Sequence, residues 1–188
     1  MGAAERLVQS TRELLWERGY LGTSPKAIQR RAGAGQGSMY HHFRGKSDLA
    51  RTAIEHTARE LRAEAARQLD APGTAVERIA EYLCRERDAL RGCPIGRLTQ
   101  DPDILADPEL HRPVGETFDW LRERLAAVLT EGRDRRELDP ALDPAATASA
   151  LLAVLQGGYV LARAAADPAA FDRAIEGALA LLDRARHH

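Results

Sequence analysis

Polar side chains gathered between Lys26 and His42 have the chemistry to bind a nucleic acid. Lys and Arg attract backbone phosphates, hydroxyl and imidazole groups can bond to phosphate oxygens, and Gln can pair with the edge of an adenine. These groups can act together only if the surrounding chain holds them on one surface. The residues concerned are Lys26, Arg30, Gln36, Ser38, Tyr40, His41 and His42.

The first element expected here is a short helix that begins after Thr23 or Ser24. Either hydroxyl can accept a hydrogen bond from an amide of the opening helical turn. Pro25 suits the first helical position, where its missing N–H costs nothing. Ile28 and Ala32, four residues apart, are expected to share the inner face.

A second short helix is expected from Gln36 to Phe43. Gly33 can adopt the left-handed conformation that ends the first helix and turns the chain. Met39 and Phe43 are expected on the inner side, which leaves the polar side chains outward. The pattern predicts a helix-turn-helix whose second helix can enter a groove of DNA.

Longer helical patterns flank this motif. Apolar residues recur at helical spacing over residues 4–18, and Gly19 marks the end of that helix. A further helix is expected from Lys46 to about Leu69, with Lys46 at the positive helix end, where an anion is favoured. Trp16 lies off the main apolar stripe, so a partly buried supporting role is favoured over stacking on a base.

The distribution of charge supports this interpretation. The formal net charge is −1, yet residues 1–50 carry eight Lys and Arg against four Asp and Glu, a balance of +4. The remainder carries 19 against 24, a balance of −5. Because attraction to phosphate is local, the basic end of the chain is the end expected to bind.

The first quarter of the chain resembles the DNA-binding signature of TetR-family transcriptional regulators. The resemblance is carried without a gap by Gly19-Tyr20, Thr23-Ser24, Ile28, Ala32-Gly33, Gly37 to Phe43 and Lys46 to Leu49. Gly35 stands where that family usually has a capping Ser or Thr, and Gln36 replaces a frequent Lys. These departures leave the operator sequence open. The segment from Gly92 to Gly96 is similar to one in the branch that includes the LmrA and YxaF regulators.

The resemblance implies a role for each matching residue. Contacts to backbone phosphate are expected from Thr23, Ser24, Ser38, Tyr40, His42 and Lys46. Gln36, Gly37 and His41 are expected toward the groove, where Gln36 can pair with adenine and Gly37 permits close approach. Lys26 and Arg30 would add electrostatic affinity.

The whole pattern predicts an all-α chain with two domains. A three-helix helix-turn-helix domain is expected over residues 1–47, and a helical bundle for ligand binding and dimerisation over residues 48–188. Turn-forming residues follow Leu69, and helices are expected over about 74–90, 108–132, 144–166 and 168–186.

A small-molecule effector is expected inside the helical bundle. Arg87 lies on the apolar stripe of its helix, where it can snorkel, pair with a buried carboxylate or contact a ligand, and the structural roles are favoured. Phe118 and Leu121 are most simply core residues, and Trp120 could instead enter a subunit contact. The candidate lining residues are Tyr82, Leu83, Arg87, Phe118, Trp120, Leu121 and Tyr159.

The last two helices predict a homodimer. The first of them is apolar around much of its circumference, so it must be covered on more than one side. A twofold contact between two such helix pairs would cover it, and the resemblance implies the same arrangement. The residues expected in the contact are Leu151, Leu155, Gly158, Ile175, Leu179 and Leu182.

Several other classes of protein have no support in the sequence. Cys84 and Cys93 fit no metal-ligand spacing, His111 stands alone, and no catalytic constellation, metal site or cofactor motif is recognisable. For Cys93, a packing role is favoured over a redox sensor. We expect no apolar run that approaches the ~20 residues of a membrane span, and no export signal. The sequence therefore predicts a cytoplasmic protein. The final His187-His188 is assigned no role.

These features predict a homodimeric, ligand-responsive transcriptional regulator, most simply a repressor. It would bind a palindromic operator in double-stranded DNA, and an apolar or aromatic effector would release it. The alternatives are a helical dimeric adaptor that has lost DNA binding, suggested by Gly35, and an enzyme-like protein that binds small molecules.

Overall fold

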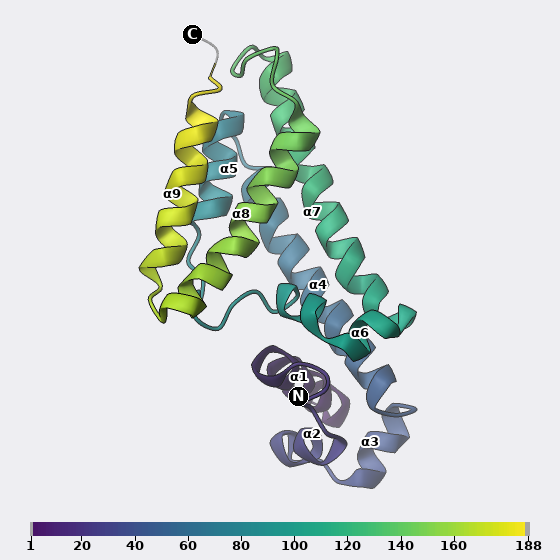
Figure 1. Cartoon of the computed structure of the whole chain (residues 1–188). Coiled ribbons are helices and arrows are strands. Elements are labelled where there is room, and N and C mark those ends of the chain that lie inside the picture. The colour runs from purple at the N-terminus through teal and green to yellow at the C-terminus, as the bar shows by residue number, and fades with distance from the viewer. Residues whose placement is uncertain (1, 187–188) are drawn as a thin grey trace. The chain divides into compact units, whose positions relative to one another are not determined.

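The computed structural model describes residues 2–186, which are almost entirely helical (Figure 1). Within that range there is no strand, and a single isolated β-bridge joins Leu138 to Arg186. The predicted all-α class is therefore confirmed. The elements are α1 (Ala3–Arg18), α2 (Pro25–Ala32), α3 (Gln36–His42), α4 (Lys46–Leu69), α5 (Ala75–Cys84), the 3-10 helix η1 (Gly96–Gln100), α6 (Pro102–Ala106), α7 (Pro108–Asp134), α8 (Pro144–Ala165) and α9 (Ala169–Asp183).

The chain forms two compact units, and neither is a continuous segment. The first unit runs to Leu61 and includes Cys93–Thr117, and the second contains Arg62–Gly92 and the chain from Phe118 onward. By packing, the first part of α4 and the segment Cys93–Thr117 belong with the helix-turn-helix. The division predicted after residue 47, which separates the residues expected to bind DNA from the rest of the chain, stays a prediction.

Local signals set the limits of the helix-turn-helix. Ser24 caps α2 by accepting a 3.2 Å hydrogen bond from the Ala27 amide, and Pro25 opens the helix. Gly33 ends α2 in the left-handed conformation, with φ of 57°. α3 begins after Gly35, which has no side chain to cap it. These limits agree with the sequence-based expectations, except that Phe43 follows the last helical residue of α3.

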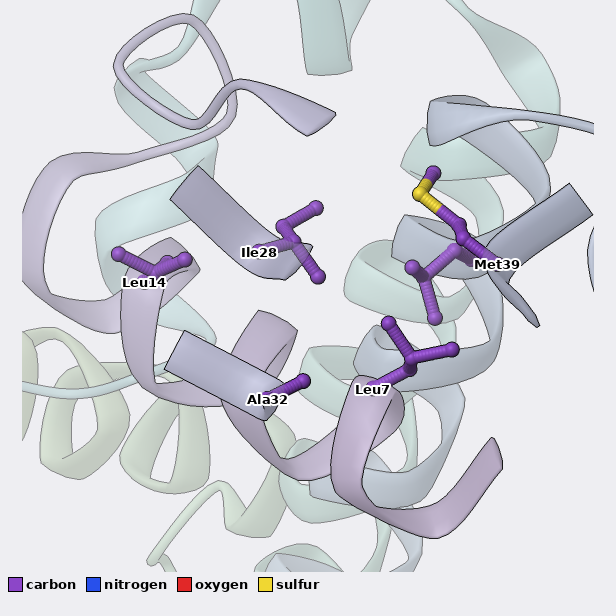
Figure 2. Packing of buried hydrophobic residues seen from close by; sticks show 6 residues of the cluster. Leu7, Leu14, Ile28, Ala32 and Met39 are labelled. Carbon is purple, nitrogen blue, oxygen red and sulfur yellow. The ribbon is translucent and has the colours of Figure 1, made fainter. Parts of the chain in front are cut away.

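A small apolar core holds the first three helices and the start of α4 together. Leu7 and Leu14 of α1, Ile28 and Ala32 of α2 and Met39 of α3 point toward one another (Figure 2). Leu49 of α4 completes the cluster, and Phe43 packs against it. Met39 is fully buried, so one side chain fixes which face of the seven-residue α3 is left for solvent.

The carboxylate of Asp101 ties the loop after α1 to the start of α6. Its Oδ2 accepts hydrogen bonds from the amides of Tyr20 at 2.7 Å and Leu21 at 3.0 Å. Its Oδ1 accepts from the Asp103 and Ile104 amides and caps α6. Because Asp101 is 8% exposed, these bonds are largely shielded from water, and they position the loop from which α2 starts.

Helix α5 is shorter than predicted, because it ends at Cys84 rather than near Leu90. The Arg87 guanidinium folds back and donates to the carbonyl oxygens of Leu83 at 2.7 Å and Tyr82 at 2.6 Å. These are carbonyls that a continuing helix would have satisfied with its own amides. Leu90, at the end of the predicted helix, is 44% exposed.

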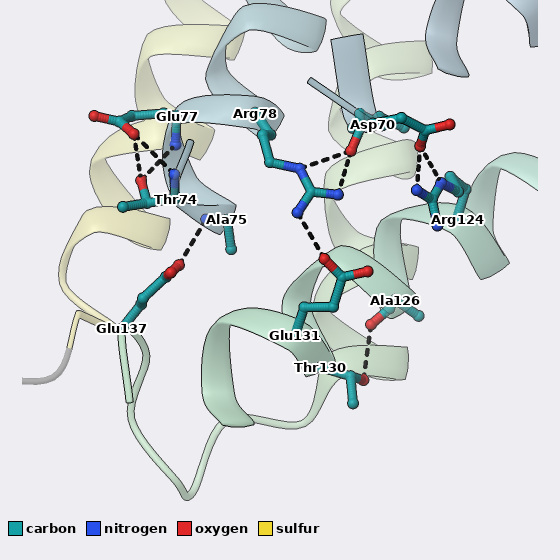
Figure 3. A network of polar contacts seen from close by, with 11 residues as sticks. Asp70, Thr74, Ala75, Glu77, Arg78, Arg124, Ala126, Thr130, Glu131 and Glu137 are labelled. Carbon is teal, nitrogen blue, oxygen red and sulfur yellow. Dashed lines mark hydrogen bonds and ion pairs between the residues drawn. The ribbon is translucent and has the colours of Figure 1, made fainter. Parts of the chain in front are cut away.

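A charged network fixes the turn between α4 and α5 (Figure 3). Arg78 donates to the carbonyl oxygen of Leu69, the last residue of α4, and forms a 2.7 Å ion pair with Glu131 of α7. Arg124 of α7 pairs with Asp70 in the turn. Arg78 is only 6% exposed, and it had not been singled out from the sequence.

Helices α8 and α9 pack along each other in the second unit (Figure 1). Gly158 makes this close approach possible, because a Cβ there would lie 2.9 Å from Cδ2 of Phe171. α8 has 22 residues, and an 18-residue stretch of it has a mean hydropathy of 1.5, so by length and composition it could cross a membrane, contrary to the expectation that no such run exists. One such helix is weak evidence, since a packed helix of a folded domain has the same composition.

Candidate nucleic-acid interface and effector site

The outer face of α3 is polar and open to solvent. Tyr40 is 51% exposed, whereas its neighbour Met39 is fully buried. Ser38 is half-buried. The His41 and His42 rings lie edge to face at 4.9 Å between centroids. The exposed residues of this face are Gln36, Gly37, Tyr40, His41 and His42, which are the residues expected to meet DNA.

Exposed cations lie on the helices next to this face. Lys26 and Arg30 project from α2 into solvent, and Ser24, at the start of that helix, is also exposed. Arg44, between α3 and α4, is exposed too and was missed in the sequence analysis. Its position directly after the recognition motif was the available signal.

The Thr23 side chain is buried in the turn between α1 and α2. The residue is 2% exposed, and its hydroxyl donates a 2.6 Å hydrogen bond to the carbonyl oxygen of Gly19. Its amide donates to the carbonyl oxygen of Tyr20. The side chain therefore closes the turn between α1 and α2, and the contact to phosphate expected from Thr23 stays a prediction.

Lys46 is engaged inside the first unit. Its ammonium donates a 2.8 Å hydrogen bond to the carbonyl oxygen of Tyr20 and lies 3.7 Å from the centre of the Tyr20 ring. Burial lowers the pKa of Lys46, and the charges of Asp103 and Asp101 act in the opposite direction. The structure thus places the Lys46 ammonium on Tyr20 rather than in solvent, where a phosphate would meet it.

Some predicted effector residues come together in the second unit. The guanidinium carbon of Arg87 lies 5.2 Å from the Tyr82 ring centre and 5.9 Å from that of Phe171. The Phe171 ring in turn lies tilted against that of Tyr159, with 4.7 Å between ring centres. Phe171 was missed as a member of this cluster because the sequence pattern placed it only on the stripe of the last helix.

The other predicted effector residues divide by burial. Leu83 is 1% exposed and belongs to the core. Phe118, Trp120 and Leu121 are half-buried on α7, so Phe118 and Leu121 are not the full core residues expected there. Their contact with an effector stays a prediction.

An open cleft of about 370 Å³ beside the α4–α5 turn is a poor match for an apolar effector. Most of its lining is charged, and two of its arginines are already paired with carboxylates (Figure 3). The lining residues are Asp70, Ala71, Pro72, Gly73, Arg78, Arg124, Glu131 and Arg135.

Most residues predicted for the dimer contact are used within the chain. Leu151, Leu155, Ile175 and Leu182 are each 3–5% exposed, and Gly158 is buried against Phe171. Their assignment is corrected: they pack α8 and α9 within one chain. Leu179 is half-buried. The large apolar side chains that these helices expose are Val160, Leu161 and Leu181.

Both parts of the chain match known family descriptions. Residues 7–53 match "Bacterial regulatory proteins, tetR family", and residues 73–178 match "Tetracyclin repressor-like, C-terminal domain". The second match alone covers more than half of the chain.

The chain belongs to the TetR family of transcriptional regulators.

Relatives of this TetR-family regulator span most of its length. The transcriptional regulator AcuR of Cereibacter sphaeroides is 30% identical over 168 residues, which are 86% of this chain and 76% of AcuR. LmrA of Bacillus subtilis is 28% identical over 113 residues, 55% of this chain and 59% of LmrA. YxaF of the same organism also matches, so the predicted relation to LmrA and YxaF is confirmed.

Solved structures show the same fold. A TetR-family regulator from Cytophaga hutchinsonii superimposes with a TM-score of 0.88 at 21% identity, covering 98% of this chain and 95% of its own. FadR of Bacillus subtilis, solved in complex with stearoyl-CoA, has a TM-score of 0.76 at 19% identity and covers 95% of this chain and 96% of its own.

The family decides between the classes of function. The family and the relatives are transcriptional regulators, so this TetR-family chain is a DNA-binding regulator with a ligand-binding domain and is not an enzyme. Among the described residues, no group of three or more His, Cys, Asp and Glu side chains could hold a metal ion.

Proposed function

We propose that the protein is a homodimeric repressor that binds a near-palindromic operator and leaves it when a small apolar or aromatic molecule binds. The observation that carries this proposal is the distribution of buried and exposed side chains on α3. One fully buried side chain, Met39, anchors the helix, and the opposite face offers only glycine and polar side chains to solvent. A short helix held in this way is suited to the major groove.

The proposed contacts separate base readout from phosphate binding. Gln36 pairs with a base edge, with His41 beside it, and Gly37 lets the backbone approach. A Cβ at Gly37 would meet nothing within 4 Å in the free protein, so glycine there is not needed for folding. The phosphate contacts fall to Ser24, Ser38, Tyr40 and His42, with Lys26, Arg30 and Arg44 supplying long-range attraction.

The proposed dimer contact uses the outer faces of α8 and α9. Val160, Leu161 and Leu181 are 54–67% exposed, which leaves large apolar side chains in water on the free chain. At Gly157 and Gly177 a Cβ would meet nothing within 4 Å, so both sites can admit another helix. A second copy placed by a twofold axis would cover these residues and present two α3 helices to symmetric half-sites.

Release requires that the effector prefer a conformation that binds DNA poorly. A coupling free energy of about 1–3 kcal/mol between effector and operator would suffice. α4 is the proposed carrier, since it is one continuous helix that begins in the first unit and ends in the second. Action on chromosomal DNA places the protein in the cytoplasm.

Selection of bound DNA from a random pool tests the proposal. The expected product is a near-palindrome whose binding weakens steeply with salt, and candidate metabolites are then tested for release. Gln36→Ala should change the preferred base at one position of each half-site, whereas Tyr40→Phe should weaken binding to all sequences alike. A monomer at working concentrations, or failure to enrich any sequence at low salt, would contradict the proposal.

A further inference from the structure

Two arginines of the second unit lie against one tyrosine ring. The guanidinium carbon of Arg85 is 5.4 Å from the centre of the Tyr82 ring, and that of Arg87 is 5.2 Å from it. Tyr82 is 3% exposed and Phe171, next to Arg87, is 4% exposed. Both guanidinium groups therefore lie against one buried ring, in a largely apolar, aromatic environment.

The surrounding protein balances only one of these charges. Arg85 forms a 2.6 Å ion pair with Glu64 of α4. No carboxylate within residues 2–186 lies within ion-pair distance of Arg87, whose Nη atoms donate to three main-chain carbonyl oxygens. Burial lowers the pKa of Arg87 most, and the charge of Arg85 lowers it further, although Tyr159 acts the other way. The cluster thus holds one positive charge in excess.

Both guanidinium groups also lack a hydrogen-bond acceptor at the same atom. Nε of Arg85 and Nε of Arg87 are out of contact with solvent, and neither has an acceptor among the described residues. Arg78, elsewhere in the same unit, shows the satisfied alternative, because its Nε bonds to the Leu69 carbonyl oxygen and its Nη1 to Glu131. A buried donor normally has a partner, so the two Nε–H groups indicate that an acceptor is missing.

We propose that Arg85 and Arg87 bind the carboxylate of a small organic acid, whose apolar or aromatic body is covered by the neighbouring rings. This inference rests on the proposed function, and it adds the chemical class of the effector. A single carboxylate matches the one excess charge, whereas a phosphate monoester, with about −1.5 to −2 charges at pH 7, would exceed it. Charge-assisted hydrogen bonds to arginine are the recurrent means of carboxylate recognition.

Matched acids and amides test the charge requirement. Benzoate and hexanoate are titrated into the full chain without DNA, at constant ionic strength, beside benzamide and hexanamide. Calorimetry should show at least one acid binding about tenfold or more tightly than its amide, since only the acid is charged. If neither acid binds more tightly than its amide, the proposal is overturned.

Two substitutions should shift acid binding in opposite directions. Arg85→Gln should weaken it about tenfold, because one charged donor is lost. Glu64→Gln should tighten it, because a competing carboxylate is removed, and a purely structural role for the ion pair does not predict this. The exposed Arg173→Gln, with its side chain 64% exposed, is the matched control and should change nothing.

Arg87 needs a milder change, because its guanidinium also caps α5. Arg87→Lys keeps the charge but loses the forked donor geometry, so acid binding should weaken while the circular dichroism spectrum is retained. Unchanged acid binding in both Arg85→Gln and Glu64→Gln would overturn the proposal. If an acid binds as described but leaves operator affinity unchanged, the binding site stands and the proposed release of DNA fails.

Discussion

The two units use their positive charges in different ways. The first unit keeps Lys26, Arg30 and Arg44 in solvent, whereas the second buries Arg78 to 6% exposure and half-buries Arg87. An exposed charge acts over roughly the Debye length of about 8–10 Å on any phosphate, and salt screens it. A buried charge must be met by a particular acceptor nearby. The difference shows that burial, more than residue type, decides whether an arginine of this chain contributes to affinity or to structure.

Lys46 falls between these two groups. It lies at the start of α4, where the DNA-binding signature of the family continues, but its ammonium is held by the carbonyl oxygen and the ring of Tyr20. Lys46 can therefore be tested for either behaviour: that of an exposed charge, which acts on DNA, or that of a buried charge, which acts on folding.

Arg78→Met should have the largest effect. The substitution removes the donors to the Leu69 carbonyl oxygen and to Glu131, and it leaves that buried carbonyl unsatisfied. The free energy of unfolding in denaturant should fall by about 2–3 kcal/mol. Arg112→Met is the control: its side chain is 54% exposed and paired with Glu109, so its loss should cost less than about 0.5 kcal/mol. Equal effects of the two substitutions would remove the contrast between buried and exposed arginines.

Lys26→Ala should affect DNA binding and not folding. Loss of one cation that neutralises phosphate charge should lower the slope of log K against log salt by about 0.9 and cost roughly eightfold in affinity at 0.1 M salt. The free energy of unfolding should change by less than about 0.5 kcal/mol, because Lys26 is exposed. Fluorescence anisotropy at several salt concentrations measures the slope, with Arg112→Ala as the matched variant outside the helix-turn-helix. A preserved slope would place Lys26 away from phosphate.

Lys46→Met should destabilise the first unit. The expected loss is about 1 kcal/mol, from one hydrogen bond and one contact with an aromatic face. Affinity for DNA should fall at all salt concentrations by a similar factor, so the salt slope should stay as it is. A slope lowered by about 0.9 would instead mean that Lys46 leaves Tyr20 and contacts phosphate in the complex.

Acid should weaken the Arg78–Glu131 pair by a smaller amount. Arg78 holds the pKa of Glu131 below its usual value, mainly through their hydrogen bond. A carboxyl group whose pKa is lowered by folding adds stability above its unfolded pKa of about 4.3, and that stability is lost as pH falls through the folded pKa. Because the Glu131 side chain is 40% exposed, we expect less than about 1 kcal/mol. At pH 7 the free energy of unfolding of Glu131→Gln should therefore be lower than that of the unaltered chain, and the two values should converge in acid. A difference that stays constant down to pH 2 would show that the ionised Glu131 carboxylate is not the source of this stability.

The helix-turn-helix could be predicted closely because its determinants are local. The cap at Ser24, the proline after it and the left-handed Gly33 act within a few residues of the backbone they shape. Helical spacing also identified the buried faces of α2 and α3, down to Met39. No neighbour distant in sequence was needed for these predictions.

The errors arose where the direction of a side chain, or a contact with another helix, decides the outcome. Arg87 ends α5 by folding back on it, and periodicity continues past that point because it carries no information about where a guanidinium turns. The contact predicted for α8 and α9 went to the wrong residues for a related reason. Both faces of α8 are apolar, and the pattern does not say that α9 of the same chain covers the face that contains Gly158.

The sequence by itself determined the helical class, the helix-turn-helix and the family, since these depend on caps, spacing and a motif that lie within short segments. Only the tertiary structure decided that Thr23 closes a turn, that Lys46 rests on Tyr20 and that Arg85 and Arg87 share one ring. The physical reason is that burial and charge pairing depend on how side chains turn and which groups meet in space, and spacing along the chain does not encode this.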